Sequence, residues 1–308
     1  MMDTIIQKDR DEMEIIAKSK KSFGISLSLL EVTSTILIAS LVKLIAAELS
    51  VFLILFFRYL FCIPLLFLTS FYQRKKDTFK IISKSGLFVR TVAGLFSFGF
   101  LFAALKYIDL SLMTTLLNTI PLFVTLLAPI LINERVGLFK IIMALIGFMG
   151  VFLIINPNYE LLKFNNFGII YGILCPLCAS IMLISLRKLG NTDHPTTTAL
   201  WYNIIGALVF YLICVIINID FKIIENYYFI LILIGVLSSL QQICLSYSHK
   251  LLPVSLLAPL RYISVPLGIL VGVIYFDETM QPLFYLGAFI IGLTCVLIVA
   301  KKDIKIKS

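Results

Sequence analysis

Long runs of apolar residues, separated by short polar segments, make up most of the chain. The runs lie at residues 24–46, 50–70, 87–107, 110–132, 138–155, 168–186, 197–218, 228–248, 252–275 and 281–300. Each is close to the roughly 20 residues that a helix needs to cross a bilayer. They are continuously apolar instead of alternating, and lipid leaves backbone groups no partner outside a helix or a closed barrel. The pattern therefore predicts an all-α polytopic membrane protein of ten transmembrane helices.

The composition agrees with a lipid bilayer as the surrounding solvent. The chain is 60% hydrophobic and 14% charged, whereas soluble domains have about 25% charged residues. The net charge of +9 is spread over short connecting segments and forms no basic face interleaved with aromatic residues. We therefore expect no nucleic-acid partner.

The Lys and Arg residues are distributed unevenly between the two sides of the predicted bundle. Ten crossings put both termini on one side, and 19 of the 26 basic residues fall on that side, against three on the other. Basic residues are enriched on the cytoplasmic side of membrane proteins. This predicts a cytoplasmic leader at residues 1–23, a cytoplasmic tail at residues 301–308 and location in the cell inner membrane.

The two halves of the chain show a weak internal repeat at a shift of 144 or 145 positions. The matches are Pro121 with Pro266, Gly147 with Gly292, and Glu134 within one residue of Glu278. Residues 24–156 and 167–300 then form two five-helix repeats, and an odd number of crossings inverts the second. Inverted repeats are typical of secondary transporters, whose solute site lies near the midplane. Chance alignment of apolar helices is the alternative.

Several short motifs carry a family resemblance. They are Arg90, Ala-Ala-Leu-Lys-Tyr-Ile at 103–108, Pro121 with Glu134, Ala-Pro-Leu-Arg-Tyr at 258–262, and Phe-Asp-Glu at 276–278. Together they resemble the drug/metabolite transporter superfamily, in its ten-helix EamA-like group. The resemblance implies two inverted repeats around a central cavity, in a monomer or a homodimer, and transport of small metabolites. The 258–262 motif is similar to that of the S-adenosylmethionine uptake branch.

Two opposite charges within the apolar runs are the sharpest candidates for a binding site. A charge at the bilayer centre costs from about 2.5 kcal/mol upward, so Arg261 and Glu31 need a partner. Arg261 either faces the cavity, where its planar fork can hold a carboxylate or phosphate, or pairs with Glu31. Glu31 either couples protons, binds a substrate ammonium group or neutralises Arg261.

Three further basic residues lie within the apolar runs. Arg58 is an additional substrate-binding candidate, because it falls well inside the second run. We expect Lys43 to extend its ammonium group to the membrane surface and Arg90 to orient its helix beside a basic loop.

Uncharged polar residues at mid-run positions are candidates for the cavity wall. These are Asn118, Tyr262 and one of the adjacent Gln241 and Gln242, which point about 100° apart on a helix. Pro121 and Pro266 each remove a backbone hydrogen bond at matching places in the two halves. They are candidate hinges for alternating access.

The sequence offers no recognisable catalytic chemistry. It shows no phosphate-binding loop, no metal-ligand spacing and no nucleophile beside a base, and all six cysteines fall inside apolar runs. We therefore predict no enzymatic activity, no metal and no cofactor. The favoured hypothesis is a secondary transporter of a small polar organic metabolite, such as an amino acid or a derivative, with S-adenosylmethionine uptake as the alternative. A membrane-embedded receptor or lipid-modifying enzyme is the rival from another class.

Overall fold

The computed structural model describes residues 2–132, 136–155, 166–190, 192–251 and 260–300. Glu134, the first part of the predicted ninth run at 252–259 and the predicted tail at 301–308 lie outside the described residues. Within the described part every regular element is a helix, which confirms the all-α class there.

The helices follow the predicted apolar runs. They are α1 (Met2–Ile45), α2 (Val51–Arg74), α3 (Lys84–Leu105), α4 (Leu110–Leu117), α5 (Ile120–Ile132), α6 (Leu138–Ile155), α7 (Asn166–Leu189), α8 (Pro195–Ile216), α9 (Tyr228–Leu251), α11 (Ser264–Phe276) and α12 (Pro282–Ala300), with short 3-10 turns at Lys75–Asp77 and Lys222–Asn226. Seven segments of the described chain are long and apolar enough to cross a membrane, the span Leu110–Leu131 combining α4 with most of α5. Three shorter apolar helices at Leu138–Ile154, Leu260–Phe276 and Pro282–Ile298 complete the described set.

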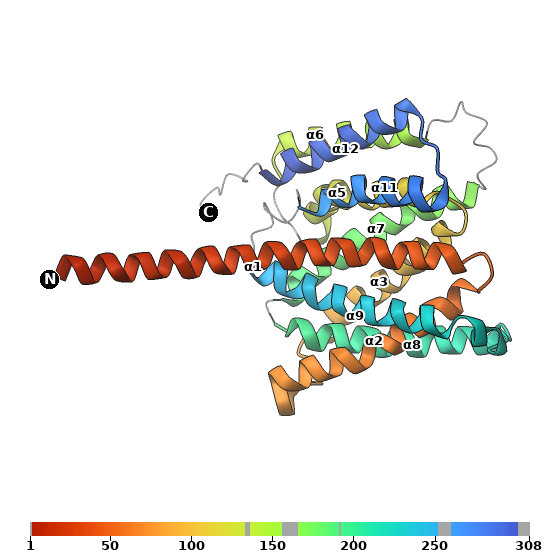
Figure 1. Cartoon of the computed structure of the whole chain (residues 1–308), viewed down its shortest axis with the longest axis horizontal. Helices are drawn as coiled ribbons and strands as arrows, with labels where there is room; N and C mark the ends of the chain where they lie inside the picture. The colour runs from red at the N-terminus through yellow and green to blue at the C-terminus, as the bar shows by residue number, and fades with distance from the viewer. Residues whose placement is uncertain (1, 133–135, 156–165, 191, 252–259, 301–308) are drawn as a thin grey trace.

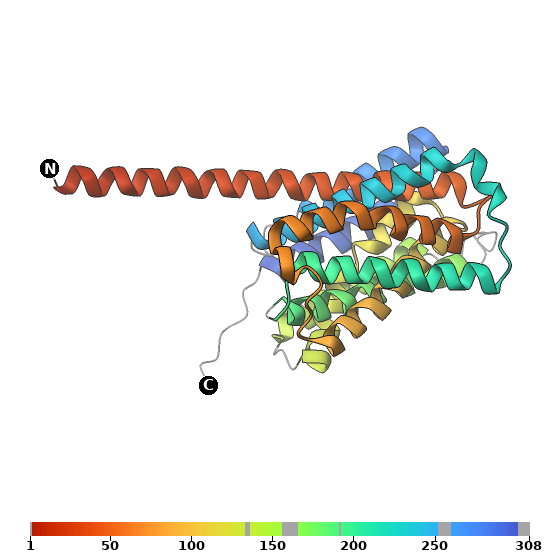
Figure 2. The same ribbon diagram turned by 90° about the horizontal axis from the view of Figure 1, so that it is seen from below.

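The helices lie side by side in one bundle, from which the first part of α1 projects (Figures 1 and 2). The main contacts join helices that are far apart in the sequence. They pair α1 with α9, α2 with both α8 and α9, α3 with α7, α4 with α11, α5 with α7 and α6 with α12. In each pair one helix comes from the first half of the chain and the other from the second.

Glycines allow some of these pairs to approach very closely. An added Cβ at Gly150 on α6 would lie 2.9 Å from the carbonyl oxygen of Gly287, and one at Gly287 on α12 would lie 2.6 Å from that of Gly150. Neither position has room for a side chain. Small residues at such contacts are typical of helix packing in membranes, where close van der Waals contact drives association.

The two prolines matched by the internal repeat coincide with breaks in helices. Helix α4 ends at Leu117 and α5 begins at Ile120, so Pro121 has no N–H to offer the Leu117 carbonyl. In the second half the helix is interrupted at Ile263. Pro266 likewise has no N–H to offer the Tyr262 carbonyl. The structure therefore places a break beside each proline, while their hinge motion stays a prediction.

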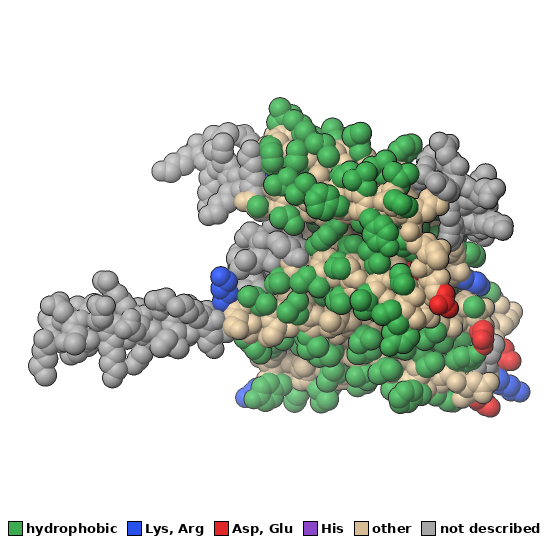
Figure 3. Space-filling model, turned by 45° about the horizontal axis from the view of Figure 1, so that its top comes forward, with side chains coloured by type: hydrophobic (Ala, Val, Ile, Leu, Met, Phe, Trp, Pro, Cys, Tyr) green, Lys and Arg blue, Asp and Glu red, His purple; other side chains and the backbone are tan. Residues whose placement is uncertain are grey.

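The outer surface of the bundle is strongly apolar. Figure 3 shows hydrophobic side chains over most of the face it presents, with charged side chains at the two ends. Large side chains such as Phe229 and Ile130 are 78% and 74% exposed. Apolar exposure on this scale is expected for a surface that contacts lipid.

Candidate functional site

A cavity of about 1770 Å³ lies among helices from both halves of the chain. Its lining runs from mid-bundle residues to the end of the bundle that carries Arg74, Lys140 and Arg187, which we call the open end. The opposite end, which carries Lys43 and Glu278, contributes no residue to the lining, and we call it the closed end. The cavity therefore reaches one end of the bundle and stops short of the other.

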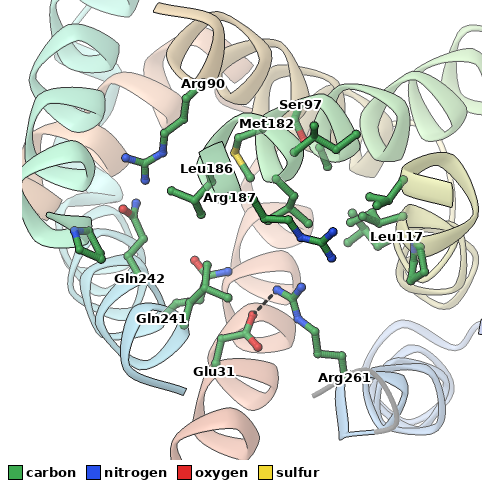
Figure 4. A pocket seen from close by; sticks show the side chains of 18 of the residues that line it. Glu31, Arg90, Ser97, Leu117, Met182, Leu186, Arg187, Gln241, Gln242 and Arg261 are labelled. Atoms are coloured by element: carbon green, nitrogen blue, oxygen red, sulfur yellow. Dashed lines mark hydrogen bonds and ion pairs between the residues drawn. The ribbon is translucent and has the colours of Figure 1, made fainter. Parts of the chain in front are cut away.

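Glu31 of α1 and Arg261 form an ion pair in the cavity wall (Figure 4). Arg261 Nη2 donates to Glu31 Oε1 at 3.0 Å. The Glu31 side chain is 4% exposed and that of Arg261 31%. The sequence left a cavity role and mutual pairing as alternatives, and the structure shows both together. The pair offers one negative and one positive group to the cavity with no net charge.

The two helix breaks meet beside this pair. Asn118 Nδ2 donates to Ser264 Oγ at 2.7 Å and to the Thr114 carbonyl oxygen at 2.8 Å. Tyr262 donates its hydroxyl to the Ala288 carbonyl oxygen. Both predicted residues, Asn118 and Tyr262, line the cavity, and the hydrogen bond across the breaks joins the first half to the second.

Helix α9 contributes both of its adjacent glutamines to the lining. Gln241 donates to Thr35 Oγ1 of α1 at 3.0 Å, and Gln242 accepts from Asn203 Nδ2 of α8 at 3.2 Å. The sequence favoured only one of them as a cavity residue, and the structure brings both into the lining.

The structure places Arg58 outside the cavity lining, behind it. Arg58 is fully buried, with its guanidinium carbon 3.7 Å from the Phe98 ring centroid and 4.8 Å from that of Tyr59. Phe98 itself lines the cavity. This differs from the sequence expectation of direct substrate contact, because the apolar run fixes depth but not the face on which a residue lies.

Arg90 of α3 lies in the cavity wall, which the sequence did not predict. It is 8% exposed, its guanidinium carbon lies 5.5 Å from the Tyr202 ring centroid, and its Nε and Nη1 have no hydrogen-bond partner among the described residues. In the sequence Arg90 stands out only as part of a family motif. That motif does not say whether its side chain points into a cavity.

A cluster of charged groups joins three elements at the closed end. Glu278 Oε1 accepts from Lys43 Nζ of α1 at 2.6 Å and from the Leu110 backbone N at 2.6 Å. Glu278 Oε2 accepts from the Ser111 backbone N at 3.0 Å and from Ser111 Oγ at 2.6 Å. Lys43 also lies 3.6 Å from Asp109 Oδ1. We call these five residues the closed-end cluster.

Opposite charges and the first backbone N–H groups of α4 hold the closed-end cluster together. A carboxylate at the first backbone N–H groups of α4 satisfies donors that have no partner inside the helix. Burial raises the pKa of Glu278, but hydrogen bonds from Lys43 and Ser111 outweigh it and hold that pKa below its ordinary value. Burial and the neighbouring Glu278 raise the pKa of Asp109. Lys43, expected to extend to the membrane surface, is instead an internal counter-ion.

The described residues contain no group of three His, Cys, Asp or Glu side chains placed to hold a metal ion. The six cysteine thiols are free.

Comparison with known proteins gives a consistent result. The sequence model of the EamA-like transporter family matches the chain twice, at residues 22–156 and 166–300. A protein of Helicobacter pylori named as an uncharacterized transporter is 28% identical over 296 residues, covering 92% of this chain and 97% of its own. A riboflavin transporter of Vibrio cholerae is 27% identical over 183 residues, covering 59% of this chain and 60% of its own.

One solved crystal structure is similar over most of the fold. It aligns with a TM-score of 0.62 at 17% identity, covering 91% of this chain and 98% of its own. At this identity the likeness concerns the fold alone.

Proposed function

Because the chain belongs to the EamA-like transporter family and is a membrane transporter, we propose that it is a secondary transporter built from two inverted repeats of five transmembrane helices. The two matches to the family model, one in each half, support the repeat. The three shorter apolar helices added to the seven long spans support ten crossings.

The pairing of helices supports the same symmetry. Counting α4 and α5 as one crossing, a two-fold axis exchanges α1 with α7, α2 with α8, α3 with α9, α4 with α11 and α6 with α12. Under this exchange the contact of α3 with α7 becomes that of α9 with α1, and both are main contacts of the bundle. The contacts of α2 with α8, α4 with α11 and α6 with α12 map onto themselves.

The charge distribution supports an orientation with both termini in the cytoplasm, in the cell inner membrane. In this orientation the open end faces the cytoplasm. The arrangement of the cavity then corresponds to an inward-open state, with the closed-end cluster sealing the outer side. Alternating access requires that this cluster opens when the inner side closes.

The Glu31–Arg261 pair is the observation that carries the substrate proposal. An amino acid at neutral pH has one ammonium and one carboxylate group. It can exchange its own charges for those of the pair, with the ammonium on Glu31 and the carboxylate on the planar fork of Arg261. Every charge keeps a partner in this exchange. Burial of an unpaired ion would cost several kcal/mol. The substrate class is therefore a zwitterionic metabolite, an amino acid or a derivative.

Glu31 acts as a counter-charge in this proposal instead of a proton carrier, since Arg261 already occupies it. S-adenosylmethionine carries the same amino-acid group and belongs to the class. Its sulfonium cation needs an aromatic face, and the lining Tyr262 supplies a ring. Riboflavin, the solute named for the Vibrio cholerae relative, is a second candidate supported by that likeness.

Purified protein in proteoliposomes tests the proposal by counterflow. Vesicles loaded with unlabelled solute are diluted into labelled amino acids, S-adenosylmethionine or riboflavin. We expect accumulation of zwitterionic solutes, and its loss in Glu31→Gln and Arg261→Gln proteins. Glu48→Gln, an exposed acid outside the lining, is the matched control. Accumulation of riboflavin with no zwitterion moved overturns the substrate proposal.

A further inference from the structure

Arg90 is a buried cation that the proposed pair does not use. It lies on α3, and Figure 4 shows its side chain pointing into the cavity, on the side where Gln242 lies. It is more than nine-tenths buried, and two of its three guanidinium nitrogens have no partner among the described residues. A buried charge without a partner is costly, so the wall is incomplete without an anion.

A second cation lies behind the first. Arg58 stacks on Tyr59, the Tyr59 and Tyr202 hydroxyls are 2.7 Å apart, and Arg90 lies over Tyr202. None of the nitrogens of the Arg58 guanidinium has a hydrogen-bond partner in the described part of the chain. The described ion pairs include neither arginine. Two positive charges therefore share one aromatic cluster, which we call the Arg90 cluster: Arg58, Tyr59, Arg90 and Tyr202.

The local packing fixes the position of this cluster. Gly94, one turn beyond Arg90 on α3, leaves the space that the Tyr202 ring fills, since an added Cβ would lie 2.8 Å from Tyr202 Cε2. Gly206 on α8 does the same for Tyr59, whose Cδ1 would lie 2.8 Å from a Cβ there. The rings that hold the two cations thus depend on glycines from two helices.

The Arg90 cluster and the Glu31–Arg261 pair border the same cavity. A chain of polar side chains, partly in the cavity wall and partly behind it, joins them. Asn203 follows Tyr202 on α8 and bonds to Gln242, the adjacent Gln241 bonds to Thr35, and Thr35 lies one turn beyond Glu31 on α1. A single ligand in this cavity can therefore meet the zwitterionic pair at one place and the Arg90 cluster at another.

We infer that the Arg90 cluster is a second substrate subsite, which takes an anionic oxygen group at the far end of the transported molecule. The inference rests on the proposed function and narrows its substrate class to zwitterions with an additional carboxylate or phosphate. Arg90 brings a guanidinium whose Nε and Nη1 are without partners among the described residues, and hydrogen bonds from a charged guanidinium to an anionic oxygen are about twice as strong as neutral ones. Arg58 adds positive potential from behind the rings without contacting the ligand.

Two matched ligand pairs test the subsite. Glutamate and glutamine differ by a carboxylate against an amide, and phosphoserine and serine differ by a phosphate. Their binding is measured by thermal stabilisation of the purified protein, and their transport by counterflow. We expect wild-type protein to bind one or both anionic members about tenfold to a hundredfold tighter than the neutral partner, the range for hydrogen bonds to a charged group. Whether carboxylate or phosphate is the natural group follows from which pair shows the larger preference.

Arg90→Gln is expected to abolish that preference, so that glutamate or phosphoserine binds no better than its neutral partner. Lys80→Gln removes an exposed cation outside the lining and is the matched control, which keeps the preference. Arg90→Lys is expected to keep part of it, since the charge remains without the fork.

The outcomes separate this inference from the proposed function. Equal binding of charged and neutral partners by wild-type protein overturns the subsite, while transport of the neutral zwitterion leaves the proposed function standing. A preference that survives Arg90→Gln also overturns it, and an equal loss of both partners assigns Arg90 a structural role instead. Binding with the expected preference but without counterflow supports the subsite and contradicts transport. Absence of binding for all four ligands contradicts both.

Discussion

Replacement of Glu278 by glutamine is the sharpest test of how the closed end is sealed. The carboxylate receives four hydrogen bonds, one from the Lys43 ammonium group, two from backbone N–H groups at the start of α4 and one from the Ser111 hydroxyl. Its side chain is 2% exposed and that of Lys43 is 16% exposed. Glutamine keeps the shape of the side chain but removes the charge that holds these groups together.

The expected magnitude follows from this burial. Loss of one partner of a buried ion pair costs about 3–5 kcal/mol, and we take the lower limit because Lys43 retains Asp109 at 3.6 Å. If the cluster exists only when the outer side is closed, about 3 kcal/mol shifts the conformational equilibrium toward the outward-open state by about a hundredfold.

Distance measurement between spin labels reads this shift. Labels at Ala47→Cys and Tyr275→Cys lie at exposed positions near the closed-end tips of α1 and α11, in a background without the native cysteines. We expect a single short distance in wild-type protein and a second, longer population in Glu278→Gln.

The control for this experiment is Asp277→Asn. It removes an exposed charge from the neighbouring position, where φ is 51°, and Asn tolerates this left-handed backbone as well as Asp does. An unchanged distance distribution in folded Glu278→Gln protein refutes the reasoning, because it means that the cluster does not hold the outer side closed.

Three further predictions follow from the same structure. Because the pKa of Glu278 lies below its ordinary value in the closed state, its stabilisation is complete above the ordinary carboxyl pKa and is lost as pH falls through the lowered one; the spin-label distances in wild-type protein should lengthen in acid, and those in Glu278→Gln, where Asp109 is the acid left beside Lys43, should respond less. Glu31→Gln leaves Arg261 unpaired in the cavity wall. We therefore expect the double variant Glu31→Gln/Arg261→Gln to be more stable to heat than Glu31→Gln, although neither protein transports. Losses of stability that add up in the double variant contradict the pairing. Gly287→Ala places a Cβ within 2.6 Å of the Gly150 carbonyl oxygen, so α6 and α12 must separate at a cost of about 1–3 kcal/mol; an unchanged melting temperature contradicts the close packing.

The sequence predicted the helices well because apolar length alone decides what can cross a bilayer. The breaks beside Pro121 and Pro266 were predictable only in part, because each proline removes a backbone hydrogen bond. Pro64, Pro129 and Pro176 remove one as well, yet they lie inside continuous helices. Glu31 and Arg261 could be singled out because an isolated charge is costly in lipid. Each therefore needs a partner, which is either the other residue or a ligand.

Helix faces and long-range contacts were not predictable in the same way. Arg58 and Arg90 both lie within apolar runs, and only the packing of α2 and α3 against α8 and α7 decides that Arg90 lines the cavity and Arg58 lies behind it. The contact of Lys43 with Glu278 joins residues 235 positions apart. No local pattern encodes such a pair, because it exists only once the two halves have packed.

Counterflow of one amino acid beside two of its analogues tests the zwitterionic site most directly. The analogues are the decarboxylated amine, which lacks the group for Arg261, and the N-acetylated acid, which lacks the group for Glu31. Purified protein in proteoliposomes is expected to accumulate the intact amino acid and neither analogue, and Glu31→Gln and Arg261→Gln are each expected to abolish the accumulation. Equal accumulation of all three solutes, or transport that persists in both variants, contradicts the zwitterionic site.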